Sequence, residues 1–185
     1  MVRESEMREG QADSGFSVAL AQNVSEVSVA AERILDEAVA FCAQKMHASP
    51  EAVVEQLRQG ERTARNYYDY GLAKGIAAFL GEVMEDAKGI FLCSYDATPE
   101  DLCFGEASPL IHLIVWVGRK TAALDSLISA LDQAVLRVHA GRISAPPLKN
   151  LLDVQVVDDA DVEGRVGYGA MLSSASNRPI CIWTR

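Results

Sequence analysis

The spacing of apolar residues predicts three helices in the first half of the chain. Apolar side chains recur at helical intervals over 25–46, and a serine at the first of these positions can serve as the N-cap. The stretch 49–60 predicts a short second helix, because Pro50 suits its first turn and Gly60 suits its end. A third and longer pattern covers 61–87 and contains a G-x-x-x-G spacing, which favours a close contact between helices.

The second half of the chain predicts strands around one long helix. Four short stretches are rich in apolar, β-branched and aromatic residues: 89–96, 109–117, 151–157 and 179–183. The segment 118–141 carries an apolar helical face and ends at a glycine, so it predicts an amphipathic helix. In the third strand, alternation places Asp153 and Gln155 on the same side. Residues 158–164 read as an acidic turn, and 167–175 as a short helix or loop.

This order predicts an α/β (α+β) protein in which N-terminal helices precede a small mixed β-sheet with helices, in the order α-α-α-β-β-α-β-(α)-β. Residues 1–24 are polar and small without a sustained period, so we expect a disordered N-terminal segment. Residues 25–60 then form a helical segment and 61–185 an α/β domain. The wide apolar face of the first helix must be covered, either within the chain or across a homodimer.

Composition narrows the classes of function and the compartment. The chain has 185 residues and a net charge of −9, which disfavours binding to nucleic acids and anionic membranes. No apolar run reaches the roughly 18 residues needed to span a bilayer, and the first residues lack the apolar core of a signal peptide. None of the four cysteines lies in a C-x-x-C pair, so we expect free thiols in a cytoplasmic protein.

One polar residue interrupts the apolar strand at 109–117, which reads PLIHLIVWV and holds His112. The strand before it ends in FLCSYD, with Ser94 at its turn, and the third strand, LLDVQVV, holds Asp153. With this layout, residues 65–184 resemble the minimal nucleotidyltransferase fold of the polymerase β-like superfamily. The resemblance implies a Gly-Ser turn that approaches a triphosphate, an Asp-x-Asp pair on the second strand and often a third carboxylate on the third strand. In that family the carboxylates hold two Mg²⁺ ions, which need such hard oxygen ligands.

The residues of this chain depart from that pattern where the chemistry lies. Cys93 stands where the family has glycine, and the two aspartate positions fall on Leu110 and His112, while Asp153 falls near the third carboxylate. One acid of three cannot assemble a two-metal site, so the resemblance implies a degenerate site, a pseudoenzyme. We then expect His112 to be partly buried and hydrogen-bonded to a neighbour such as Asp153. The candidate pocket consists of five residues: Ser94, Asp96, Leu110, His112 and Asp153.

The leading hypothesis is therefore a non-catalytic nucleotidyltransferase-like protein with a role in binding, regulation or protein interaction, with no cofactor predicted. In a second hypothesis the chain is an active metal-dependent nucleotidyltransferase that recruits Glu106 and Asp153, with Mg²⁺ and a nucleotide as cofactors. In a third it is a small unrelated α/β ligand-binding module. The partner is an unidentified protein or small molecule in each case.

Three further groups of residues carry alternatives. Acidic residues cluster in 96–106 and 158–163; they match no calcium-loop spacing and read as solvated loops. Cys93 and His112 lie on strands expected to be neighbours, which leaves a nucleophile and its base conceivable. The tyrosines of NYYDYG, residues 66–71, either line a base-stacking pocket or pack the long helix onto the sheet.

Overall fold

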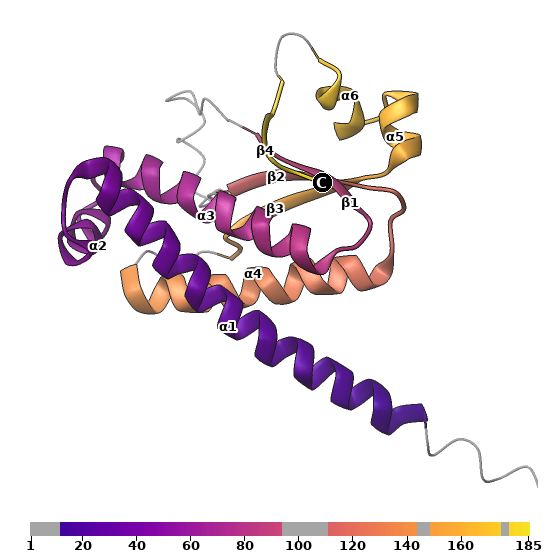
Figure 1. The fold of residues 1–185 in the computed structure, drawn as a ribbon, viewed down its shortest axis with the longest axis horizontal. Helices are drawn as coiled ribbons and strands as arrows, with labels where there is room; N and C mark the ends of the chain where they lie inside the picture. Colours follow the sequence, from indigo (N-terminus) through magenta and orange to yellow (C-terminus); the bar gives the residue numbers. More distant parts are fainter. Residues whose placement is uncertain (1–11, 94–110, 144–148, 175–177) are drawn as a thin grey trace, which may run out of the picture.

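The computed structural model describes the backbone of residues 12–93, 111–143, 149–174 and 178–185, and the side chains of these ranges from residue 25 onward. Within these ranges the helices and strands follow the predicted order (Figure 1). The elements are α1 (Ala12–Met46), α2 (Pro50–Arg58), α3 (Arg62–Val83), β1 (Ala87–Leu92), β2 (Ile111–Val117), α4 (Ala122–Ile143), β3 (Leu152–Val157), α5 (Asp159–Gly164), α6 (Tyr168–Leu172) and β4 (Ile180–Thr184). None of the described helices is long and apolar enough to cross a membrane.

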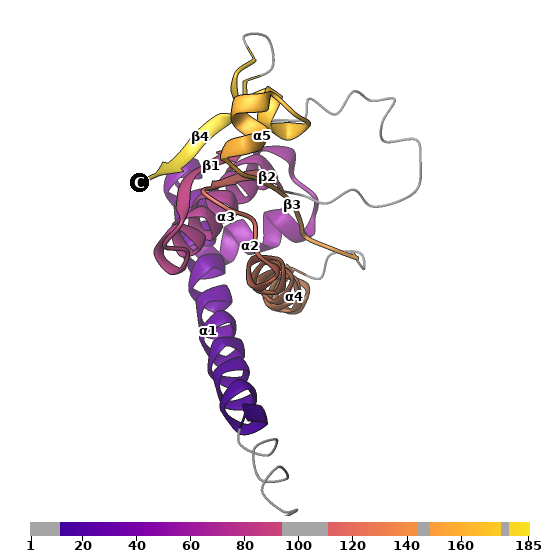
Figure 2. The same ribbon diagram turned by 90° about the vertical axis from the view of Figure 1, so that its right-hand side faces the viewer.

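The four described strands form one mixed sheet in the order β3-β2-β1-β4. β1 pairs antiparallel with both β2 and β4, whereas β2 and β3 are parallel and are connected through α4. Helices α1, α3 and α4 lie on one side of the sheet, and the short helices α5 and α6 lie on the other (Figure 2). The predicted α/β (α+β) class, with helices first and a small mixed sheet after them, is confirmed.

The first helix begins earlier than its apolar pattern indicated. α1 starts at Ala12 and not at Ser25, which corrects the predicted start of the first helix. The disordered N-terminal segment stays a prediction. Residues 12–24 hold no proline and several alanines, so a helix already formed by packing can propagate through them. In Figure 1 this end of α1 projects away from the other elements. Residues 1–11 lie outside the described residues.

The G-x-x-x-G spacing on α3 marks a close approach to α1, as predicted. A Cβ atom at Gly71 would lie 3.0 Å from the Cα atom of Ala38, and one at Gly75 would lie 3.1 Å from Cγ2 of Ile34. Two helix backbones can come this near only where a side chain is missing. The two glycines therefore allow the short distance between α1 and α3.

The apolar face of α1 is covered within the chain. From Val27 to Ala43 its inward side chains are buried, and they belong to the same core as α2, α3, α4 and the sheet. This confirms the predicted packing of the N-terminal helices across the α/β part. The predicted homodimer stays a prediction.

The acidic stretch predicted as a turn forms helix α5 instead. The carboxylate of Asp158 accepts a hydrogen bond from the backbone N–H of Asp161, and the carboxylate of Asp161 accepts one from the N–H of Asp158. This reciprocal capping box satisfies N–H groups that would otherwise lack partners at the start of a helix. These aspartates therefore begin a helix. The sequence analysis predicted a turn because so many residues of this stretch are acidic.

Candidate functional site

The candidate site lies on the face of the sheet opposite to α3. Trp183 of β4 contacts Gly81 of α3 and pairs with Ile90, which in turn pairs with Val115 of β2. These residues therefore point toward the helical layer. Because side chains alternate along a strand, His112, three positions before Val115, points to the opposite face.

On this face the imidazole of His112 is hydrogen-bonded to Asp153. The two residues are direct neighbours in the parallel β2–β3 register, and His112 Nδ1 lies 3.0 Å from Asp153 Oδ2. The other carboxylate oxygen, Oδ1, accepts a hydrogen bond of 2.7 Å from Nε2 of Gln155. The expected contact between His112 and Asp153, and the shared side of Asp153 and Gln155, are both confirmed. An ionised Asp153 requires the proton on Nδ1, so this contact selects the tautomer and the orientation of the ring.

Cys93 extends this arrangement onto β1. Its backbone N–H donates to the carbonyl of His112 at 2.9 Å, which continues the antiparallel register by one residue beyond Leu92 and Leu113. The thiol side chain therefore stands directly opposite His112. Burial raises the pKa of the Cys93 thiol, and the negative charge of Asp153 raises it further. We call the residues Cys93, His112, Asp153 and Gln155 the polar row.

The other end of the same face is occupied by a clamp between the sheet and α5. Lys88 Nζ lies 2.7 and 2.6 Å from the two carboxylate oxygens of Asp159, and Trp116 Nε1 donates to Asp159 Oδ1 at 3.0 Å. The hydrogen bond from Lys88 is the main cause that lowers the pKa of Asp159. Lys120 pairs in the same way with Asp161. Asp159 and Asp161 are thus paired with lysines, which supports a structural role for these two acids.

Two of the five predicted pocket residues, His112 and Asp153, are brought together by the structure. Ser94, Asp96 and Leu110 lie outside the described residues, and so does Glu106, the acid invoked for the active alternative. Within the described ranges, no three His, Cys, Asp or Glu side chains are grouped as metal ligands.

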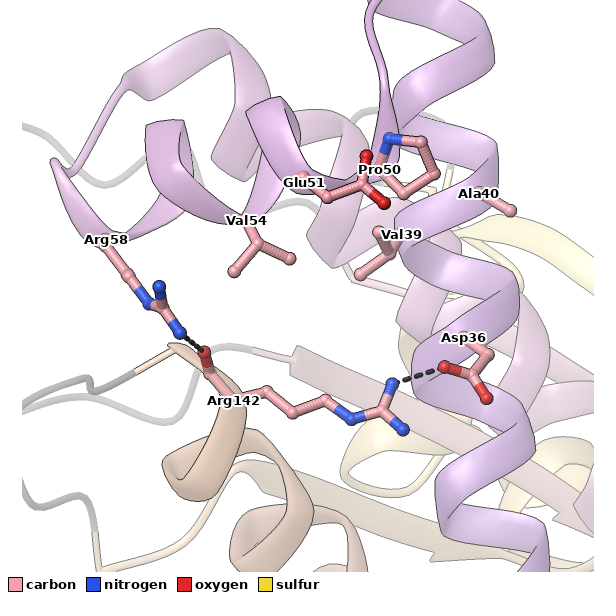
Figure 3. Close-up of a pocket in the computed structure, with 8 residues that line it drawn as sticks. All are labelled: Asp36, Val39, Ala40, Pro50, Glu51, Val54, Arg58 and Arg142. Carbon is pink, nitrogen blue, oxygen red and sulfur yellow. Dashed lines mark hydrogen bonds and ion pairs between the residues drawn. The ribbon is translucent and has the colours of Figure 1, made fainter.

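Two features escaped the sequence reasoning, and the first is a groove between α1, α2 and the end of α4 (Figure 3). It has a volume of about 490 Å³, and Val39 and Val54 form part of its wall. Arg58 Nη2 donates to the carbonyl of Arg142 at 2.8 Å, and the guanidinium of Arg142 pairs with Asp36. No pattern in the sequence could have revealed the groove, because its lining comes from three separate segments.

The second is a buried polar pair between α3 and α4. Tyr68 Oη lies 3.0 Å from His139 Nδ1, and His139 is only 3% exposed, with no partner at Nε2. Burial lowers the pKa of His139 to about 4. Tyr68 thus packs between helices, and Tyr70 contacts Phe41 of α1, so the expectation that the tyrosines pack the long helix onto the sheet is corrected.

No protein-family model matches the chain, and no curated protein or solved structure matches it either.

Proposed function

We propose that this chain is a non-catalytic, nucleotidyltransferase-like protein that acts by binding, in a regulatory or interaction role. The observation that carries the proposal is the pair His112 and Asp153. The resemblance implies a metal-binding carboxylate at position 112 and a third carboxylate near position 153. In this chain, His112 and Asp153 are neighbours in the β2–β3 register and are hydrogen-bonded to each other. A histidine that donates to the remaining acid occupies the place where two acids would otherwise share a cation.

The order of the elements adds support. A helix leads into β1, β2 follows, and α4 connects β2 to a parallel β3, as the resemblance requires of the elements that carry its motifs. The chain lacks the metal-binding carboxylates that the transfer reaction needs. A leucine at 110 cannot bind a hard cation, and a neutral imidazole prefers softer metals than Mg²⁺. Asp153 alone would leave the charge on a transferred phosphoryl group largely unstabilised.

A transfer assay tests the absence of catalysis. The purified protein is incubated with each labelled nucleoside triphosphate, Mg²⁺ or Mn²⁺, and pooled protein, RNA and small-molecule acceptors. We expect the original chain to show no more metal-dependent transfer than the variant Asp153→Ala. The matched control is Asp125→Ala, which removes an exposed carboxylate on α4. Metal-dependent transfer that disappears in Asp153→Ala and survives in Asp125→Ala would establish the second hypothesis, an active enzyme with unusual acids.

Restoring the missing acids tests the resemblance itself. The double substitution Leu110→Asp and His112→Asp supplies the Asp-x-Asp pair that the resemblance requires. If β2 descends from a catalytic strand, this variant should bind Mn²⁺ together with a nucleoside triphosphate more tightly than the original chain, as measured by calorimetry. His112→Asp alone is the control and should gain little. A folded double variant with no gain in metal binding would favour the third hypothesis, an unrelated α/β ligand-binding module.

A further inference from the structure

The groove between α1, α2 and the end of α4 is apolar in its middle and charged at its ends. On α2 it is lined by Glu51, Val54 and Arg58. Their spacing of three and four positions places them in one row along the helix, with an acid, an apolar residue and a base in that order. Val39 of α1 lies beside Val54 and extends the apolar middle (Figure 3). The row on α2 therefore offers opposite charges on the two sides of an apolar surface.

Both charges of this row are accessible to a ligand. Arg58 donates from Nη2 to the carbonyl of Arg142, and its Nη1 is 3.8 Å from Glu55 Oε2, which is too long for a hydrogen bond. A guanidinium has five N–H donors, so Arg58, whose side chain is 46% exposed, can still bind an anion. Glu51 is exposed, and hydrogen bonds from its own backbone N–H and from Ser49 lower the pKa of its carboxyl. Glu51 is therefore ionised at neutral pH and can bind a cation.

The distance between these charges sets the length of a fitting ligand. The other two charged lining residues, Arg142 and Asp36, form an ion pair and so neutralise each other. Glu51 and Arg58 are seven positions apart, and a helix rises 1.5 Å per residue, so their backbone positions are about 10 Å apart along α2. An extended peptide spans about 3.3–3.6 Å per residue, so about three residues cover the same length.

We propose that the groove binds a short peptide of about three residues with free ends and an apolar central side chain. The carboxylate of the peptide pairs with Arg58, its ammonium group pairs with Glu51, and the central side chain packs on Val39 and Val54. The volume of about 490 Å³ is within the usual range for small-ligand pockets. A purely apolar ligand would desolvate both charges without pairing them, and a ligand of one sign would pair only one of them.

This site is independent of the proposed function. The groove belongs to the helical layer on one side of the sheet, whereas the polar row lies on the opposite face. The transfer and metal-binding assays above contain no peptide of this kind as a ligand for the helical layer. The two proposals therefore fail separately.

The test titrates the full chain with the tripeptide alanyl-leucyl-alanine and follows the NMR signals of valine methyl groups. We expect the signals of Val39 and Val54 to shift, with a Kd on the order of 0.1–1 mM for a ligand of this size. Triglycine has the same ends but no side chains, so it should bind about tenfold more weakly. Acetylation of the amino end or amidation of the carboxyl end should each weaken binding about threefold or more. Equal affinities of the free and blocked peptides, or no shift at about 10 mM peptide, would overturn the proposal.

Variants assign each end of the peptide to its partner. In Arg58→Gln, amidation of the peptide should cost no further affinity, whereas acetylation should still weaken binding, and Glu51→Gln should show the reverse pattern. A variant that merely distorted the groove would weaken every form of the peptide by the same factor, and that result would refute the assigned contacts. Arg62→Gln, which removes an exposed arginine at the start of α3, should leave all affinities unchanged. If a variant fails to fold, the comparison of free and blocked peptides on the unsubstituted chain still decides the proposal.

Discussion

Asp69 on α3 predicts an unusual dependence of stability on pH. Its carboxylate is largely buried and Oδ1 has no hydrogen-bond partner. Burial raises the pKa of this carboxyl from its ordinary 3.8 to about 7, although the nearby Arg65 opposes the shift. The folded state therefore binds a proton that the unfolded state has already lost. The stabilisation from this proton is present at low pH and is lost as pH rises toward about 7.

The magnitude follows from the interval between the two pKa values. Each pH unit over which only the folded state holds the proton is worth about 1.4 kcal/mol, so raising pH from about 5 to about 8.5 costs the folded state about 3 kcal/mol through Asp69. The substitution Asp69→Asn removes this titration. An asparagine left without partners carries its own penalty of about 1–3 kcal/mol, but that penalty does not depend on pH.

The assay is urea unfolding of both proteins at several pH values. We expect the free energy of unfolding of Asp69→Asn, relative to the original chain, to rise by about 3 kcal/mol between about pH 5 and about pH 8.5. His139, whose pKa is lowered from 6.5 to about 4, makes both proteins lose stability as pH falls through that interval, and this loss cancels in the difference. Asp125→Asn, on an exposed site, should show no such trend. A difference that stays flat across the pH range would refute the reasoning.

Further predictions concern packing, capping and the first helix. Gly71→Ala should destabilise the fold by about 1–3 kcal/mol in urea unfolding, because its Cβ meets the backbone of Ala38, whereas Gly141→Ala, with open space around it, should be neutral or stabilising. Asp158→Ala should cost about 1 kcal/mol through loss of the capping box, and an unchanged midpoint would contradict that role. A chain that begins at Ser25 should keep its melting temperature within a few degrees, since the described buried residues of α1 begin just after it; a large loss would show that the preceding segment stabilises the fold. Light scattering at micromolar concentration tests the homodimer, and a mass near 20 kDa would exclude it.

Local patterns were sufficient for the type and order of most elements. The cap at Ser49, the proline after it and the glycine at position 60 predicted α2 nearly to the residue, because these signals act within one turn of backbone. Boundaries were less predictable. α1 extends to Ala12 because a helix that has formed can propagate through a segment without proline. α5 forms because two aspartates cap each other, which a count of acidic residues does not show.

The sequence alone could single out His112 as the odd residue in an apolar strand and Asp153 as its candidate partner, since alternation along each strand is a local property. Whether they meet depended on the register between β2 and β3, which are separated in the chain by the whole of α4. The opposition of Cys93 and His112, the burial of Asp69 and the pairing of Tyr68 with His139 also arise between distant segments. Desolvation and electrostatic fields depend on what packs around a group. Tertiary structure therefore decided the chemistry of these side chains, while periodicity and capping had already decided the elements that carry them.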